Sequence, residues 1–376
     1  MKTMLFKQFA GLACVWFSVA TAGAQTLATQ EHRIRVNTLT EGLSHPWSLA
    51  FLPDGRMLVT ERTGRLRLIG KDFKLEAQPV GGVPEVAATG QGGLLDVVLH
   101  PKFAENNLLY LSYSAGDRNG IGTEVARCVL KGNRLENVQV IFRMAPKLRT
   151  GYHFGSRMVF DREGFLFITL GDRGEMDRAQ NPGDHNGSVI RLHDDGRVPK
   201  NNPFADKPGW RAEKFSLGNR NVQGAALHPQ SGLLWTHEHG PQGGDEVNVI
   251  RAGVNYGWPV ITYGANYGTG TKIGEGTAKD GMAQPLHRWV PSIAPSGMAF
   301  YTGDKFPKWR GDLFVGALKD QLLVRLKLEG EKVVREERML RNTLGRIRDV
   351  RQGPDGLIYL LTNESNGVLA RLEPAE

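Results

Sequence analysis

The chain has 376 residues, a formal net charge of +8 and only two cysteines. Its 47 Lys and Arg residues are scattered, without a block of five or six and without interleaved aromatic residues, which argues against nucleic-acid binding. No apolar run is long enough to cross a membrane, so no membrane span is expected.

Residues 1–24 are predicted to be a secretory signal peptide. A basic start is followed by a short apolar stretch and by Ala22-Gly23-Ala24, an A-x-A cleavage site. A membrane anchor needs about 18 continuous apolar residues, and a lipoprotein site at Cys14 is the weaker alternative. Such a signal peptide would direct the chain to the periplasm or outside the cell, with cleavage expected after Ala24. This cleavage leaves Cys128 as the single cysteine, so no intramolecular disulfide can form.

Residues 25–376 are predicted to form one all-β domain. Short strand-like runs are separated by turns rich in Gly and Pro, and no linker divides them. One sequence pattern recurs: apolar residues and a turn containing Pro or Asp precede a strand rich in Leu, Tyr, Phe or Val. Its six copies lie at residues 51–59, 100–113, 160–168, 227–235, 306–315 and 353–361. Six copies predict a six-bladed β-propeller with four-stranded antiparallel blades, and a pair of β-sandwiches is the alternative.

A strand at residues 34–39 is expected to complete the last blade and close the ring. The longer gaps between repeats, at about 170–220 and 245–295, are expected to be loops over one face. Loops on a rigid scaffold are where binding and catalytic residues are concentrated.

The first polar cluster along the chain contains a histidine among glycines, His153, and an aspartate at the end of the next strand, Asp172. If the aspartate reaches the imidazole, it can orient the ring as a general base. A structural histidine and a turn-capping aspartate are the alternatives.

Positive side chains also recur at strand ends. Arg220 stands next to Asn221 before the fourth repeat, and Lys319 follows a strand of the fifth. Arg346 and Arg348 share one face of a strand because they are two residues apart. In a propeller these cations would converge on the mouth of the central channel, which implies a ligand with several carboxylates or phosphates.

The densest polar stretch covers residues 237–246. His237 and His239 share a strand face, but no third ligand lies at a spacing typical of zinc. The glycines, Pro241 and Glu246 offer oxygen ligands instead, which suit calcium. No nucleotide-binding glycine motif is present, so a nucleotide cofactor is not supported.

The chain resembles the soluble aldose sugar dehydrogenases that depend on pyrroloquinoline quinone (PQQ), relatives of soluble quinoprotein glucose dehydrogenase. The likeness extends through nearly all of residues 25–376. The segments that carry it, in order, are 45–53 (HPWSLAFLP), 90–96 (GQGGLLD), 153–155 (HFG), 220–221 (RN), 239–241 (HGP), 255–259 (NYGWP), 318–319 (LK) and 346–350 (RIRDV).

By this resemblance, His153 takes the proton from the anomeric hydroxyl of an aldose, while a hydride passes from C1 to the quinone and a lactone forms. Asp172 orients His153, and Arg220 stabilises the negative charge that develops on a quinone oxygen. Gln91 lines the pocket of both sugar and quinone. The resemblance further implies that the cofactor is bound by Asn221, Ser292, Lys319, Arg346 and Arg348.

The resemblance also implies two calcium ions (Ca²⁺). The carbonyls of Gly240 and Pro241 bind the ion that grips PQQ and polarises its quinone. The Glu246 carboxylate and the Tyr256 carbonyl bind a second, structural ion.

One position departs from the glucose-specialised relatives, which carry an acidic residue where this chain has Tyr152. We therefore expect broad use of aldose sugars, glucose and oligosaccharides included. The enzyme also needs an electron acceptor, which the sequence does not identify, and we expect a monomer or a homodimer.

Two other functions are compatible with the same propeller scaffold. A calcium-dependent propeller that hydrolyses lactones or esters would not need Lys319, Arg346 and Arg348 together. A propeller that binds glycans or proteins would use Trp258 and Trp289 as stacking platforms, but would leave His153 and Asp172 without a role.

Overall fold

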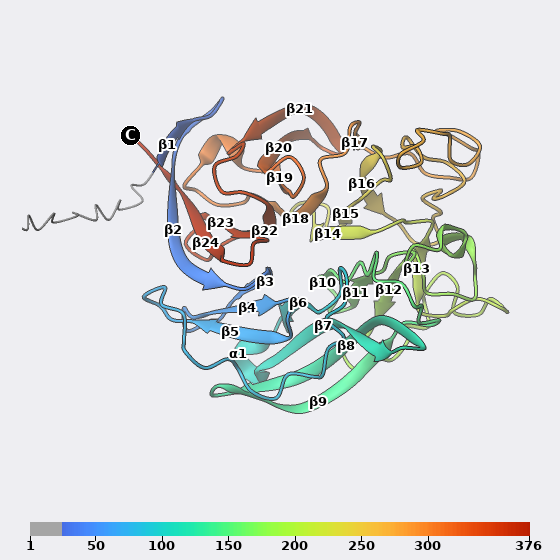
Figure 1. Cartoon of the computed structure of the whole chain (residues 1–376), viewed down its shortest axis with the longest axis horizontal. Coiled ribbons are helices and arrows are strands. Elements are labelled where there is room, and N and C mark those ends of the chain that lie inside the picture. The colour runs from blue at the N-terminus through green and yellow to red at the C-terminus, as the bar shows by residue number, and fades with distance from the viewer. Residues whose placement is uncertain (1–24) are drawn as a thin grey trace, which may run out of the picture.

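The computed structural model describes residues 25–376, and the predicted signal peptide lies outside them. Six antiparallel sheets are arranged in a ring (Figure 1). Their strands are β3 (Pro46–Phe51), β4 (Met57–Glu61) and β5 (Arg65–Ile69) in blade 1; β6 (Leu94–Leu99), β7 (Leu108–Asp117), β8 (Gly120–Lys131) and β9 (Arg134–Arg143) in blade 2; β10 (Met158–Phe160), β11 (Leu166–Thr169), β12 (Ser188–Leu192) and β13 (Lys214–Leu217) in blade 3; β14 (Val222–Leu227), β15 (Leu234–Glu238), β16 (Asp245–Ile250) and β17 (His287–Trp289) in blade 4; β18 (Pro295–Phe300), β19 (Leu313–Ala317), β20 (Leu322–Glu329) and β21 (Lys332–Met339) in blade 5; and β22 (Ile347–Gln352), β23 (Ile358–Thr362), β24 (Gly367–Pro374), β2 (Arg33–Leu43) and β1 (Gln25–Ala28) in blade 6.

The first strands of the six blades line the central axis. Each contacts the next in turn, from β3 through β6, β10, β14, β18 and β22 back to β3. Every residue of β4, β12, β19 and β23 is buried, because each blade packs against a neighbour on both of its faces. The predicted six-bladed propeller is therefore confirmed.

Helix is almost absent from residues 25–376. It amounts to one turn of α-helix, α1 (Phe103–Asn106), and the 3-10 segments η1 (Met176–Gln180) and η2 (Pro307–Trp309). No helix in these residues has the length and apolar character that crossing a bilayer requires.

Two blades depart from the predicted four strands. Strand β2 pairs with β24 from Ile34↔Pro374 to Leu43↔Gly367, so the expected closing strand is confirmed and blade 6 has five strands. Blade 1 has three. Its outer edge is covered by irregular chain, which makes only the isolated bridges Leu66↔Val80 and Ile69↔Leu75.

The six copies of the repeated sequence pattern span the turns between the first and second strand of each blade. In three of these turns an aspartate carboxylate accepts a hydrogen bond from the backbone N–H two residues later. Asp54 accepts from the N–H of Arg56 at 3.0 Å, and Asp161 and Asp355 accept in the same way. We call the end of the ring that carries these turns the turn face. Because the hairpins are antiparallel, first strands begin and second strands end at the opposite face.

The predicted loop gaps are only partly loops, since they contain β12, β13, β16 and β17. The long connection at 251–286 returns beside blade 3, where Asn255 bridges Leu217 in parallel. This brings Trp258 against Asp172 at the opposite face.

A buried ion network fills the centre of the ring. Arg157 Nη1 lies 3.2 Å from both Asp96 Oδ1 and Asp349 Oδ1. Arg351 bridges the same two carboxylates, at 3.2 Å and 2.8 Å. Ser48 donates its hydroxyl to Asp96 at 2.5 Å. The network joins the first strands of blades 1, 2 and 6 to the residue that precedes β10 in blade 3.

Candidate functional site

A cavity of about 280 Å³ lies at the opposite face, where first strands begin and second strands end. All six blades contribute to its wall, as the propeller geometry requires for a site at strand ends. The lining residues are Trp47, Arg62, Gln91, Leu95, Phe154, Gly155, Asn221, Gln223, His239, Ala294, Leu318, Arg346, Arg348 and Asn363.

His153 and Asp172 meet beside this cavity, as the sequence predicted. The imidazole Nδ1 lies 2.6 Å from Asp172 Oδ1, and the backbone N–H of His153 donates to Gln91 Oε1 at 2.9 Å. His153 has a φ of 52°, and at Gly155, two residues later, a Cβ would come within 2.6 Å of the Leu170 backbone. The flanking glycine thus permits the tight bend that presents the imidazole.

Asp172 is held on both of its carboxylate oxygens. Oδ1 also accepts the backbone N–H of Gly174 at 2.8 Å, and Oδ2 accepts the indole N–H of Trp258 at 2.8 Å. With Nδ1–H donated to Asp172, the imidazole keeps a lone pair on Nε2, which is the arrangement a general base needs.

Burial and pairing keep this histidine neutral and this aspartate ionised. Burial lowers the pKa of His153 below its ordinary value and outweighs the opposing effect of Asp172. For Asp172, burial alone raises the pKa, but the hydrogen bonds from His153 and Gly174 outweigh it and bring the pKa below its ordinary value. The imidazole is therefore ready to accept a proton near neutral pH.

Arg220 lies next to this pair, with its guanidinium over the Trp258 ring at 5.4 Å. Its Nη1 donates to the Gly240 carbonyl at 2.8 Å, the carbonyl that we expected to bind calcium. A carbonyl oxygen has two lone pairs, so this bond leaves one for a cation. The neighbouring Asn221 accepts the backbone N–H of Gly155 at 3.2 Å, which ties it to the histidine loop.

The predicted cations Arg346 and Arg348 line the cavity wall. Arg348 is buried and donates to Gln223 Oε1 at 3.0 Å, while its Nε has no partner among the described residues. Burial, followed by repulsion from Arg62, Arg157 and Arg346, lowers the pKa of Arg348 to about 9. Such an excess of buried positive charge fits an anionic ligand with several carboxylates.

Lys319 and Ser292 line an adjoining cavity of about 470 Å³ with Gly240 and Pro241. Lys319 donates its Nζ to the Ser292 carbonyl at 2.9 Å. The Ser292 hydroxyl donates to Asp245 Oδ2 at 2.7 Å, which ties this loop to the start of β16.

A small cavity lined by Glu238, Glu246, Gly240 and Tyr256 lies beneath Arg220. The two glutamates are direct cross-strand partners on β15 and β16. Burial raises the pKa of Glu238 above its ordinary value, and burial followed by repulsion from Glu238 raises the pKa of Glu246 as well. Neighbouring carboxylates with backbone carbonyls form an oxygen donor set that fits calcium.

The imidazoles of this stretch do not form a zinc site. His239 Nε2 lies 2.6 Å from the Pro295 carbonyl, and His237 is fully buried without a hydrogen-bond partner in the described chain. No group of three or more His, Cys, Asp or Glu side chains within 25–376 is arranged to hold a metal. Calcium ligation would rest on carbonyls as well as carboxylates.

Sequence reasoning missed several residues of this region. Arg62 directly follows the second strand of blade 1, as His239 directly follows the second strand of blade 4, so the repeat itself could have identified it. Glu238 lies inside the stretch that predicted calcium. Gln223 joins Arg348 to Asn221, to which it donates at 3.2 Å, but no motif marks it.

The aromatic residues divide between surface and core. Tyr152 is 58% exposed, with its ring 6.3 Å from that of His153 at the edge of the site. Trp258 and Trp289 are 6% and 2% exposed. Neither indole can therefore serve as the glycan-stacking platform that the binding-module alternative requires.

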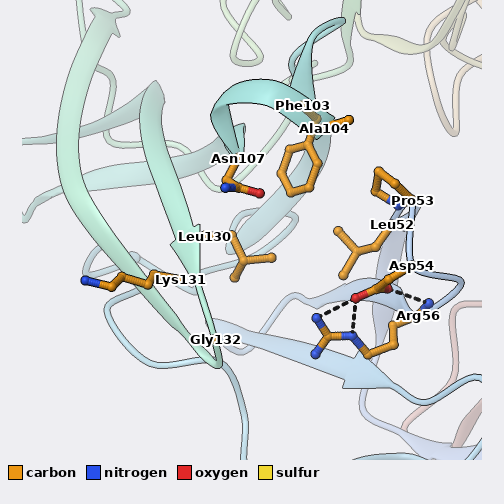
Figure 2. A pocket seen from close by; sticks show the side chains of 10 residues that line it. All are labelled: Leu52, Pro53, Asp54, Arg56, Phe103, Ala104, Asn107, Leu130, Lys131 and Gly132. Atoms are coloured by element: carbon orange, nitrogen blue, oxygen red, sulfur yellow. Dashed lines mark hydrogen bonds and ion pairs between the residues drawn. The ribbon is translucent and has the colours of Figure 1, made fainter.

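Another cavity, of about 400 Å³, opens at the turn face between blades 1 and 2 (Figure 2). Leu52, Phe103 and Leu130 surround it, and Arg56 at its rim is paired with Asp54 at 2.8 Å. It contains none of the residues predicted to bind ligand, so the cavity at the opposite face remains the candidate site.

Comparison with known proteins gives one consistent family. The family model for glucose/sorbosone dehydrogenase matches residues 43–371. The aldose sugar dehydrogenase YliI of Escherichia coli is 48% identical over 347 residues, which are 91% of this chain and 93% of that protein. The crystal structure of the soluble aldose sugar dehydrogenase of Escherichia coli in its apo form matches with a TM-score of 0.88 at 48% identity, over 91% of this chain and all of that one. The PQQ-bound aldose sugar dehydrogenase of Streptomyces coelicolor matches with a TM-score of 0.75 at 27% identity, over 90% and 98%.

Proposed function

We propose that this chain, which belongs to the glucose/sorbosone dehydrogenase family, uses PQQ to oxidise the C1 hydroxyl of aldoses to lactones, with His153 as general base; the PQQ-bound relative supports this choice of cofactor. The observation that carries this proposal is the hydrogen-bonded pair of His153 and Asp172 beside a cavity walled by unneutralised cations.

In the proposed reaction, His153 Nε2 accepts the proton of the anomeric hydroxyl as the C1–H bond breaks. Asp172 fixes the tautomer and stabilises the imidazolium that forms. PQQ, when bound, supplies the quinone that accepts the hydride from C1. The guanidinium of Arg220 would stabilise negative charge developing on an oxygen of the site, because its orientation is already fixed before reaction.

The cofactor's carboxylates would be held by Asn221, Lys319, Arg346 and Arg348, with Gln91 and Ser292 beside them. Buried cations that repel one another are stabilised by an anionic ligand, so the excess of positive charge around Arg348 supports the binding of a cofactor with several carboxylates. Arg62 adds to this charge.

Two calcium ions would complete the site. Gly240 and Pro241 would hold one through their carbonyls, and Glu246 and the Tyr256 carbonyl the other, with Glu238 as an additional carboxylate. Calcium would act as a Lewis acid at the first position and would relieve carboxylate repulsion at the second.

Removing calcium is therefore expected to lower the melting temperature of the apo-protein. A bound ion stabilises the folded state by about 2.7 kcal/mol at a hundred times its Kd. Thermal unfolding with and without a chelator measures the effect, and Glu246→Gln should melt at a temperature that responds less to calcium. A melting temperature that chelation leaves unchanged would remove the structural ion from the proposal.

Tyr152 is expected to give broad substrate use. Its single hydroxyl at the exposed edge makes fewer hydrogen bonds to sugar hydroxyls than a carboxylate would. We expect measurable kcat/KM for glucose, xylose and maltose alike, and a Tyr152→Asp variant that favours glucose by about ten-fold relative to wild type. Strict selectivity of the wild-type enzyme for one sugar would contradict this explanation.

We also propose that residues 25–376 act as a single exported catalytic domain, periplasmic or secreted, after cleavage at Ala24. Its electrons would pass to a separate acceptor, and it would work as a monomer or homodimer.

The deciding experiment is dye-linked oxidation of aldoses by apo-protein, with and without PQQ and calcium. Activity that appears only on reconstitution supports the proposal. Absence of PQQ binding would overturn it, and hydrolysis of a lactone without added quinone would then favour the hydrolase.

A further inference from the structure

One buried tryptophan touches two of the three residues proposed to carry the chemistry. The Trp258 indole N–H donates to Asp172 Oδ2 at 2.8 Å, and the face of the same ring lies 5.4 Å from the Arg220 guanidinium carbon. The inference drawn from this contact rests on the proposed function.

Trp258 is itself fixed from three directions. Its backbone N–H donates to the Gly218 carbonyl at 2.9 Å, and its own carbonyl accepts from Gln180 Nε2 at 2.7 Å. The ring packs against Ala179 and Ile273 in a small apolar cluster. The indole therefore reaches Asp172 from a rigid position rather than from a mobile loop.

The need for such a support follows from the chemistry of a carboxylate. Rotation about the last side-chain bond of aspartate is broad and two-fold, so one hydrogen bond does not fix its plane. The N–H groups of Gly174 and Trp258 hold the two oxygens separately. Only this orientation directs a lone pair of Oδ1 at His153 Nδ1.

We propose that Trp258 is a positioning residue for the catalytic base: its indole N–H fixes the plane of the Asp172 carboxylate, and through it the tautomer and orientation of the His153 imidazole. The ring face separately supports Arg220. These two functions can be separated, because phenylalanine keeps an aromatic face and lacks the N–H.

The test compares Trp258→Phe with wild type in the PQQ-reconstituted enzyme. We expect kcat to fall about 10-fold, while KM and the Kd for PQQ change less than about 2-fold. In the apo-protein, ¹⁵N spectra of the histidine rings should show His153 as the Nδ1–H tautomer in wild type and as a tautomer mixture in the variant. A purely packing role would not change the tautomer.

Trp289→Phe is the matched control. Its buried indole also donates to a carboxylate, Glu336 Oε2 at 3.0 Å, but this contact joins β17 of blade 4 to β21 of blade 5 and involves neither His153 nor Asp172. This control should lose a similar amount of thermal stability and keep both the wild-type kcat and the His153 tautomer.

The proposal is overturned if Trp258→Phe keeps the wild-type kcat and the wild-type His153 spectrum. Failure of the proposed function would look different, because wild type itself would then lack PQQ binding or sugar oxidation. The apo-protein spectra would still decide the role of Trp258 in that case.

Discussion

Replacing His153 by alanine is expected to lower kcat for aldose oxidation about 10³-fold, while PQQ still binds. The variant removes the only imidazole that is paired with an aspartate at the cavity, among the residues described. The cations that would bind the cofactor belong to other blades, so their geometry should persist. Dye-linked kinetics gives kcat, and quenching of tryptophan fluorescence gives the Kd for PQQ.

His287→Ala provides the matched control for this prediction. His287 also pairs with a carboxylate, Glu336 at 2.8 Å, on the outer strand β17 of blade 4. It should keep wild-type kinetics. If the His153 variant retained full activity with bound PQQ, the base would have to be another group and the proposed mechanism would be wrong.

Replacing Arg157 by methionine is expected to destabilise the fold by about 3–5 kcal/mol. Methionine keeps much of the volume under Trp47, on whose ring the guanidinium lies at 4.2 Å. The change leaves Asp96 and Asp349 buried with Arg351 as the remaining cation. Urea unfolding, followed by circular dichroism, measures the loss of free energy.

An exposed ion pair sets the scale for this measurement. Arg197 lies 2.6 Å from Asp195, but its side chain is 75% exposed, so Arg197→Met should cost less than about 1 kcal/mol. Equal effects of the two variants would mean that the central network contributes no more to stability than a surface pair.

The sequence predicted the architecture well because local chemistry repeats. Each Asp or Pro turn lies between two strands of one hairpin, and six such hairpins can bury their faces only by packing in a ring. The pairing of His153 with Asp172 followed the same logic, since both lie at strand ends of blade 3. The closing strand was also predicted, and β2 pairs with β24 as expected. No local pattern showed the additional strand β1 in blade 6 or the irregular outer edge that leaves blade 1 with three strands.

The parts that sequence could not predict depend on contacts between blades. In the central network, Asp96 meets Arg157, 61 positions away, and Arg351, 255 positions away, and nothing in the sequence near Asp96 indicates which arginine it meets. Trp258 reaches Asp172 from the long irregular connection at 251–286. This segment has no hydrophobic periodicity from which its path could have been predicted. Glu238 pairs with Glu246 across the hairpin of β15 and β16. Their proximity depends on the register of the two strands, which the sequence does not give.

The pairing of β2 with β24 determines when, during synthesis and folding of the chain, the cavity can form. Contacts of such long sequence separation form slowly, and the cavity takes side chains from every blade. The cavity is therefore complete only after β24 has been synthesised and has paired with β2, so under the proposed function PQQ would bind to a chain that has already closed its ring. A cofactor that touches several blades at once would in turn resist the opening of the ring. We therefore expect the half-life of the holoenzyme against unfolding to lengthen with the concentration of free PQQ.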